Sequence, residues 1–147
     1  MAISISVSGL EEAIERFEKA SIELEPSISI KLEEACQDIA NYVRMIAPKK
    51  SGRYADSVYV RQETPLRFKI GVGAPHAAVV EWGSVPHWIL PRYAQALRFE
   101  VDGEIVFAKY VHHPGTAPQF ILHRAKKANL PRIYEAILEG VREALRG

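Results

Sequence analysis

The chain has 147 residues, the length of one domain, and its hydrophobic content of 48% and charged content of 25% are ordinary for a globular protein. No apolar run approaches the roughly 20 residues that cross a bilayer, and the N-terminus lacks the basic region and long apolar core of a signal peptide. We therefore expect a single domain over residues 1–147 without a membrane segment. The single cysteine, Cys36, excludes an internal disulfide.

The charge is unevenly distributed, although the net charge is only +1. Residues 1–47 carry nine acidic and four basic side chains, whereas residues 48–147 carry nine acidic and fifteen basic ones. Six of these basic side chains lie within residues 48–70, against two acidic ones. Such a cluster is typical either of a solvated surface or of a surface that orients subunits in an assembly or faces a polyanion.

The N-terminal part predicts a short strand and then a helix. Apolar and small polar residues alternate over residues 3–7, which favours a strand. Ser8 and Glu11 have the spacing of a capping box, so we expect the first helix to begin near Ser8. Pro26 is expected to separate this helix from a second one, because proline is favoured in the first turn of a helix.

The second helix has the clearest pattern in the chain. Apolar residues recur at spacings of three and four between residues 28 and 46. Pro48 disfavours a helical conformation at residue 47, so we expect the helix to end there. Residues 49–56 then form a polar loop.

Strand signals follow the loop. Alternating apolar and polar residues predict an antiparallel hairpin over residues 57–63 and 66–72 with one buried face. The apolar run 77–82 fits either a strand or a helical turn, because periodicity cannot decide over so short a segment. Residues 84–93 are expected to form a loop in which Trp88 is exposed, and a long loop with large apolar residues is usually functional or covered by a partner.

A second hairpin is predicted over residues 96–101 and 104–111, because Asp102-Gly103 between apolar runs is a strong hairpin signal. The later strand has apolar groups on both faces, so either it is central in a sheet or one face meets another subunit. Two helices are expected after it, over residues 117–128 and 130–146.

Catalytic and metal-binding signals are weak. Four histidines with Glu81 could bind zinc, but none has a His-x-x-x-His spacing, and the neighbouring His112 and His113 point to opposite sides of a strand. We favour ordinary surface or interface histidines. The serines lack the context of a nucleophile elbow, which makes a serine hydrolase improbable.

Nucleic-acid binding is a better alternative. The basic side chains of residues 48–70 are interleaved with Tyr54, Tyr59 and Phe68, a pattern that could track phosphates and stack bases. The same alternation fits a plain hairpin with a charged outer face, which we favour because the whole chain is nearly neutral.

Three segments share the order and spacing of motifs in one family of viral structural proteins. They are residues 47–58 (APKKSGRYADSV), residues 77–84 (AAVVEWGS) and residues 113–122 (HPGTAPQFIL). In that order they resemble the "aPxxTGxLrxSI", "YAxyvEfGT" and "HPGTkpqPFLxxA" patterns of phage tail-completion and head–tail joining proteins, the gene-product-ten-like proteins of HK-ninety-seven-type long-tailed phages.

The resemblance implies an α+β fold, with a small antiparallel sheet packed by a long helix in the N-terminal half and a helix at the C-terminus. It implies a phage- or prophage-encoded structural protein without enzymatic activity or cofactor. Such proteins complete the tail, or join it to the head, by forming or capping a ring that is often sixfold. The implied partners are further copies of the chain and the tail-tube and head-connector proteins, with nucleic acid near only because of the DNA channel. The implied location is the virion tail, or the host cytoplasm during assembly.

Interface residues are then expected in the loops 48–56 and 83–95 and in the hairpin 97–111. Trp82, Trp88 and Phe107 are the expected anchors, because aromatic side chains dominate interface energetics, although core packing explains Trp82 equally well. The remaining interface candidates are Lys49, Lys50, Arg53, His113 and Phe120.

Overall fold

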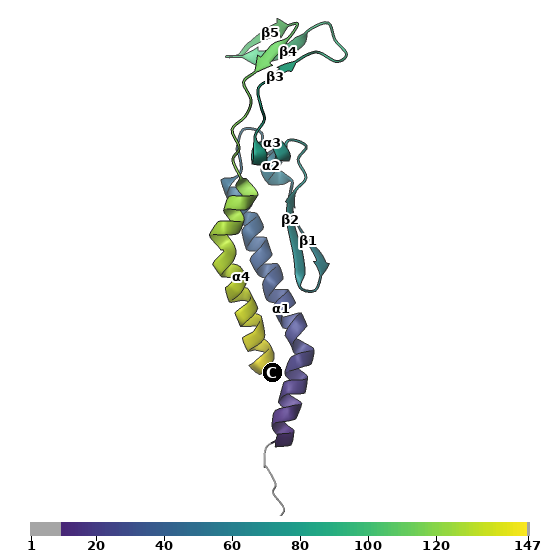
Figure 1. The fold of residues 1–147 in the computed structure, drawn as a ribbon, viewed down its shortest axis with the longest axis vertical. Coiled ribbons are helices and arrows are strands. Elements are labelled where there is room, and N and C mark those ends of the chain that lie inside the picture. Colours follow the sequence, from purple (N-terminus) through teal and green to yellow (C-terminus); the bar gives the residue numbers. More distant parts are fainter. Residues whose placement is uncertain (1–9, 147) are drawn as a thin grey trace, which may run out of the picture. The chain divides into compact units, whose positions relative to one another are not determined.

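The computed structural model describes residues 10–146, with side chains from residue 15 onward. The chain divides into two compact units (Figure 1). The first contains the residues up to Ala74 and those from Leu122 onward, and the second contains Pro75–Ile121. Each unit is described by itself below. A single domain over residues 1–147 stays a prediction, and the predicted strand 3–7 and the Ser8 cap lie outside the described residues.

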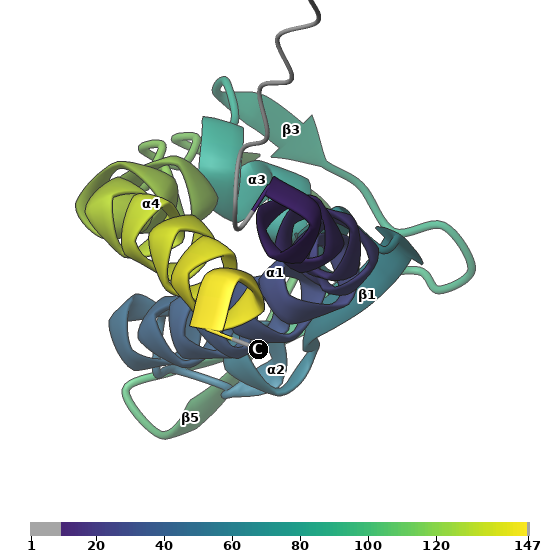
Figure 2. The ribbon, with the colours of Figure 1, turned by 90° about the horizontal axis from the view of Figure 1, so that it is seen from below.

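Two long helices, α1 (Leu10–Ile46) and α4 (Ile121–Arg146), run side by side and form most of the first unit (Figures 1 and 2). They are antiparallel, because Lys31 pairs with Glu143, whereas Asp38, further along α1, pairs with Arg132, which precedes Glu143 in α4. Glycine at position 140 permits the close approach, since a Cβ atom there would lie 2.6 Å from the Cα atom of Ile28.

The predicted breaks at Pro26 and at residue 129, just before Pro131, are wrong. Pro26 lies inside α1, and Pro131 lies inside α4, where two separate helices were expected. A proline inside a helix leaves the carbonyl four residues earlier without its hydrogen bond. Here those carbonyls belong to Ile22 and Lys127, which are exposed residues, so water can satisfy them.

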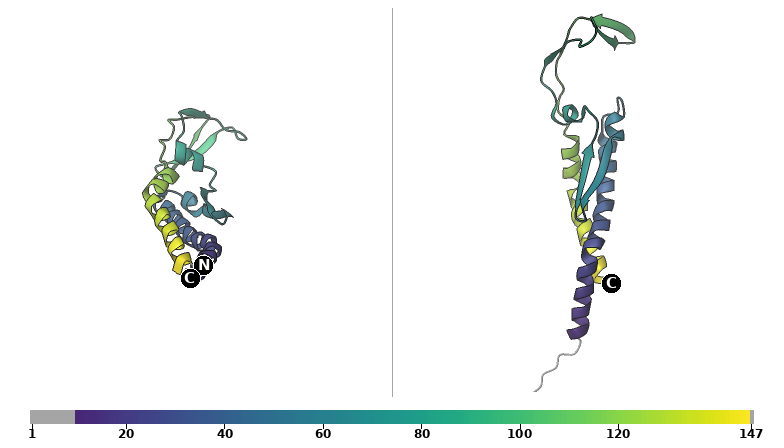
Figure 3. Two further views of the ribbon diagram at one scale, coloured as in Figure 1. Left: turned by 60° about the horizontal axis from the view of Figure 1, so that its bottom comes forward. Right: turned by 90° about the vertical axis from the view of Figure 1, so that its right-hand side faces the viewer.

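The antiparallel hairpin of β1 (Val58–Thr64) and β2 (Arg67–Val72) lies along α1, as Figure 3 shows, and confirms the first predicted hairpin. Val58 is buried on the face toward the helix, and its carbonyl accepts a hydrogen bond of 2.9 Å from Arg44 Nη2. A short helix, α2 (Arg53–Asp56), stands where a loop was expected. It begins after Gly52, whose φ of 71° suits glycine.

The second unit begins with α3 (Ala77–Trp82), which settles the short apolar run as a helix. Two antiparallel pairs follow: β3 (His87–Ile89) with β6 (Val111–His113), and β4 (Leu97–Val101) with β5 (Glu104–Ala108). Both Asp102 (φ 52°) and Gly103 (φ 87°) are left-handed, which is the turn that the Asp-Gly signal predicts.

Two strand predictions need correction in this unit. The predicted strand 104–111 is divided between β5 and β6, and the predicted loop 84–93 contains β3. The strand β5 is not central, because every sheet among the described residues has only two strands. Helices and small antiparallel sheets together confirm the predicted α+β class.

Candidate assembly surfaces

Backbone hydrogen bonds join two of the motif segments within the second unit. We call this contact, between residues 80–84 and 116–119, the clasp. The Ser84 N–H donates to the Thr116 carbonyl at 2.9 Å, and the Thr116 N–H donates back to the Ser84 carbonyl at 3.0 Å. The Gln119 N–H donates to the Val80 carbonyl at 2.9 Å, which extends the contact to α3. The segment between Ser84 and Thr116 therefore begins and ends at the same pair of hydrogen-bonded residues.

Two glycines make the clasp possible. Gly83 has a φ of 74°, and a Cβ atom there would lie 2.4 Å from the Thr116 carbonyl oxygen. Gly115 has a φ of 89°, and a Cβ atom there would lie 2.4 Å from the Ser84 carbonyl oxygen. Any other residue would be strained in conformation and would also clash with backbone. The Trp-Gly-Ser and Pro-Gly-Thr sequences are thus explained by backbone packing.

The clasp brings together two of the predicted anchors. The rings of Trp82 and Phe120 meet edge to face with centroids 5.8 Å apart. Trp82 is 73% exposed, so the core-packing alternative for this residue does not hold in the isolated chain. Phe120 is also exposed, and its φ of 50° is uncommon for a residue other than glycine. This aromatic pair is a candidate contact surface.

The pair β3–β6 carries two further candidates. Trp88 packs against the rings of His112 and Tyr110, with centroid distances of 4.7 and 5.6 Å, yet it remains 61% exposed. His113 stacks on His87 at 5.1 Å, and its Nδ1 atom accepts a hydrogen bond of 3.0 Å from the Gly115 N–H. The two neighbouring histidines 112 and 113 therefore contact different partners, as the strand alternation predicted.

The pair β4–β5 exposes apolar side chains on both of its faces. Phe107 is 65% exposed and lies opposite Arg98 in the register. Phe99 lies opposite Val106 on the other face, and both are exposed. Because no residue of β4 or β5 is buried, this ribbon has no apolar core of its own.

The predicted basic candidates lie in the first unit. Lys49, Lys50 and Arg53 are all exposed. The Lys49 Nζ atom donates to the Arg44 carbonyl at 3.1 Å, which places it over the C-terminal end of α1, where the helix dipole favours a cation. Arg53 begins α2. All eight interface candidates stay predictions, since no partner is present.

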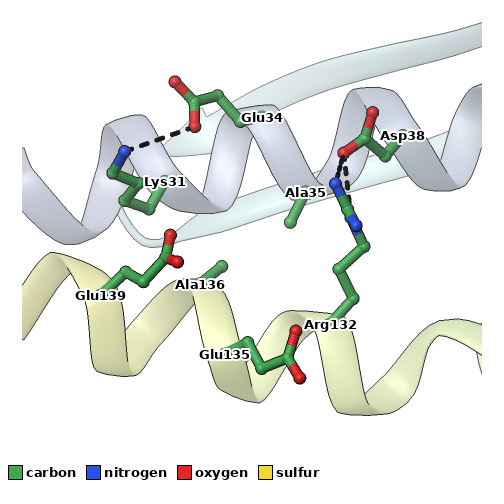
Figure 4. Close-up of a pocket in the computed structure, with 8 residues that line it drawn as sticks. All are labelled: Lys31, Glu34, Ala35, Asp38, Arg132, Glu135, Ala136 and Glu139. Carbon is green, nitrogen blue, oxygen red and sulfur yellow. Dashed lines mark hydrogen bonds and ion pairs between the residues drawn. The ribbon is translucent and has the colours of Figure 1, made fainter.

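The hollow between α1 and α4 is lined mostly by charged side chains, several of which form ion pairs (Figure 4). Arg132 Nε donates to Asp38 at 2.9 Å, and Lys31 lies 3.6 Å from Glu34 and 3.2 Å from Glu143. The hydrogen bond and the charge of Glu143 raise the pKa of Lys31 above its usual value. The pairs Lys31–Glu143 and Asp38–Arg132 join α1 to α4, so they stabilise the packing of the two helices.

A second hollow of about 320 Å³ lies between α1, β2 and α4 in the first unit. Its lining is apolar apart from Lys126, and Cys36 borders it. Burial raises the pKa of the Cys36 thiol, so the reactive thiolate form is disfavoured at neutral pH. This environment suits a core cysteine.

No group of three or more His, Cys, Asp or Glu side chains that could hold a metal ion is found among the described residues. Within that same part of the chain, no helix combines the length and the apolar character required to cross a membrane. Tyr110 is a contact residue that the sequence analysis did not single out. The signal for it was its position two residues from His112, on the same side of an expected strand.

The family assignment rests on a match over residues 11–83. This segment matches the family model described as "Bacteriophage HK97-gp10, putative tail-component". The chain belongs to the HK97-gp10-like family. The resemblance drawn from the three motifs is thereby confirmed, and the protein is a phage tail component. No curated protein and no solved structure matches the chain significantly.

The family match ends inside the clasp of this HK97-gp10-like protein. Gly83 is its last residue, so the segments 47–58 and 77–83 lie within the match and the segment 113–122 lies outside it. The hydrogen bonds of Ser84 and Thr116 join the end of the matched part to this third segment. The unmatched ribbons β3–β6 and β4–β5 lie between them in the chain.

Proposed function

We propose that this HK97-gp10-like protein completes the phage tail, or joins the tail to the head, by forming or capping a ring. It acts as a structural protein, without catalysis, in the virion tail and in the host cytoplasm during assembly. Its partners are further copies of the chain and the tail-tube and head-connector proteins. Any nucleic acid is near it only through the DNA channel.

The exposed aromatic side chains of residues 75–121 support this proposal most directly. Trp82, Trp88 and Phe107 are each more than half exposed. Large exposed apolar surfaces on a soluble chain mark interaction sites, and an isolated two-stranded hairpin is only marginally stable in water. Burial of these side chains against neighbours in a tail accounts for both features.

Tail assembly with a Trp88→Ala variant tests the proposal. Tail genes of the phage that encodes the chain are expressed together, with this chain present, absent or substituted, and particles are examined by electron microscopy. We expect incomplete tails without the chain and at least tenfold fewer complete tails with Trp88→Ala, because an anchor residue contributes roughly 2 kcal/mol or more to binding. The matched control is Tyr134→Ala, an exposed aromatic in α4 of the first unit.

Two results would contradict the proposal. One is complete, infectious particles in the absence of the chain. The other is an equal loss of complete tails with Trp88→Ala and with Tyr134→Ala. That result would show that exposed aromatic residues of residues 75–121 matter no more for assembly than those elsewhere. Thermal unfolding of the purified variants identifies any loss that comes from misfolding.

A small nucleic-acid-binding domain is the second candidate function. The observation that favours it is the cross-strand pair Arg61 and Lys69, which places two positive charges side by side on β1–β2. It requires binding to DNA or RNA whose affinity falls steeply with salt. Weak binding with a flat salt response eliminates it.

A further inference from the structure

The outer face of the hairpin β1–β2 concentrates positive charge. In the register, Arg61 lies opposite Lys69 and Tyr59 lies opposite Gly71. The Tyr59 ring covers Gly71 so closely that a Cβ atom on the glycine would lie 2.5 Å from it. Like charges directly opposite each other weaken a strand pair. Neither Arg61 nor Lys69 has an ion pair among the side chains that the structure describes, so within one copy this repulsion has no visible compensation.

The first half of α1 carries a complementary surface. Glu15, Glu18, Ile22 and Glu25 recur at spacings of three and four, which places them on one helical face. All four side chains are exposed, and Ile22 is 76% exposed. This acidic stripe (Glu15, Glu18, Ile22 and Glu25) therefore has an apolar side chain between its carboxylates. The basic face likewise places Tyr59, also exposed, beside Arg61 and Lys69.

Within one copy, Arg61 on the basic face cannot contact Glu18 on the acidic stripe. The Gln62 Nε2 atom donates to the Ser29 Oγ atom at 3.1 Å, which places the hairpin beside that part of α1. Because Gln62 faces the helix, Arg61 points to the opposite side of the strand pair. Glu18 is eleven residues from Ser29, or about 16 Å along a helix that rises 1.5 Å per residue. Since α1 is continuous, Glu15 and Glu18 cannot fold back onto the outer face.

We propose that the basic outer face of β1–β2 in one copy binds the acidic stripe of α1 in a second copy of this chain. The inference rests on the proposed function, because a repeated contact between two different surfaces is the kind that closes a ring. A second copy explains why one chain carries both surfaces and why their charges are opposite. Nucleic acid would explain the basic face alone.

Charge reversal on either surface, alone and together, tests this contact. The first variant is Glu15→Lys with Glu18→Lys, the second is Arg61→Glu with Lys69→Glu, and the third combines all four substitutions. Self-association is followed by native mass spectrometry and light scattering over a concentration series, at low and high salt. Thermal unfolding of each variant serves as the folding control, because all four positions are exposed.

We expect each single-surface variant to self-associate at least roughly tenfold more weakly than the natural chain, because like charges then face each other. The variant with all four substitutions regains association, since the charges of the two surfaces are exchanged and again opposite. An equal mixture of the two single-surface variants also associates, because each supplies the charge that the other has lost. High salt weakens association of the natural chain.

Three results would overturn the inference. They are association of both single-surface variants at the natural strength, failure of the variant with all four substitutions and of the mixture although they fold, and a natural chain that stays monomeric at every concentration. A fourth result assigns the basic face to nucleic acid instead. The natural chain would then bind duplex DNA tightly and in a salt-dependent way without self-association, and Arg61→Glu with Lys69→Glu would abolish this binding. None of these results removes the proposed function, which depends on the separate tail-assembly experiment.

Discussion

The two units differ in what they bury. The first unit buries apolar side chains from α1, the hairpin β1–β2 and α4, among them Ile39, Val43 and Ala125. In the second unit, the last residue, Ile121, is the one buried apolar side chain among residues 75–121, while many large apolar residues are exposed. The difference indicates that the first unit is stable by its own packing, whereas the second unit is held mainly by backbone hydrogen bonds. Under the proposed function, contacts with neighbours in the tail stabilise the second unit further.

The largest effect on stability is expected from Ile39→Ala in the first unit. Ile39 is 4% exposed and borders the apolar hollow between α1, β2 and α4. Truncation of a buried isoleucine lowers the free energy of unfolding by about 3 kcal/mol, because packing contacts are lost and the cavity grows. Chemical denaturation monitored by circular dichroism measures this loss. An unchanged midpoint would show that the first unit has no such core.

A smaller and more local effect is expected from Gly115→Ala. The left-handed φ and the clash with the Ser84 carbonyl oxygen should weaken the clasp by about 2 kcal/mol. Hydrogen exchange should become faster across residues 75–121 and stay the same in α1 and α4. Gly103→Asn is the control, because it sits in a turn with no atom within 4 Å of an added Cβ, and asparagine tolerates this conformation. Equal effects of the two substitutions would argue against the clasp.

The smallest effect is expected from alkaline pH and is confined to the first unit. Burial raises the pKa of the Cys36 thiol above its usual value, and the hydrogen bond and charge of Glu143 raise the pKa of Lys31. For both groups the unfolded chain loses its proton first as pH rises, so stability falls above about pH 9. The Cys36 contribution is lost first and the Lys31 contribution at higher pH.

Thermal unfolding between pH 7 and 11 measures this decline. In Cys36→Ala the decline between about pH 9 and 10 should become shallower, because the thiol no longer titrates. The same slope in the natural chain and in Cys36→Ala would contradict a raised thiol pKa. A stability that increases with pH in this range would contradict both assignments.

The sequence predicted the regular parts of the fold well. The helical spacing up to Ile46, the alternation in both hairpins and the Asp-Gly turn all express local rules, and the structure follows them. Local rules failed at Pro26 and Pro131, because neighbouring turns and packing between α1 and α4 maintain the helix across an exposed proline. A rule for a single residue cannot include that packing.

The candidate surfaces were predictable only in part. Large apolar residues in a long predicted loop pointed to Trp88, and the apolar groups on both faces of the predicted strand 104–111 pointed to Phe107. The clasp was not foreseen, because Ser84 and Thr116 are far apart in the sequence and each glycine alone signals only a turn. The acidic stripe needed the structure too, since only a continuous α1 places Glu15 and Glu18 beyond the reach of the basic face of the same copy.

Hydrogen exchange of the chain alone and in assembled tails tests the contrast between the two units most directly. For the isolated chain we predict fast exchange in β3–β6 and β4–β5 and slow exchange in the central turns of α1 and α4. In tails, the ribbons of residues 75–121 should become protected, with the largest change around Trp88 and Phe107. Ribbons that are as protected as α1 in the isolated chain, and unchanged in tails, would show that the second unit is stable alone and is not the assembly surface.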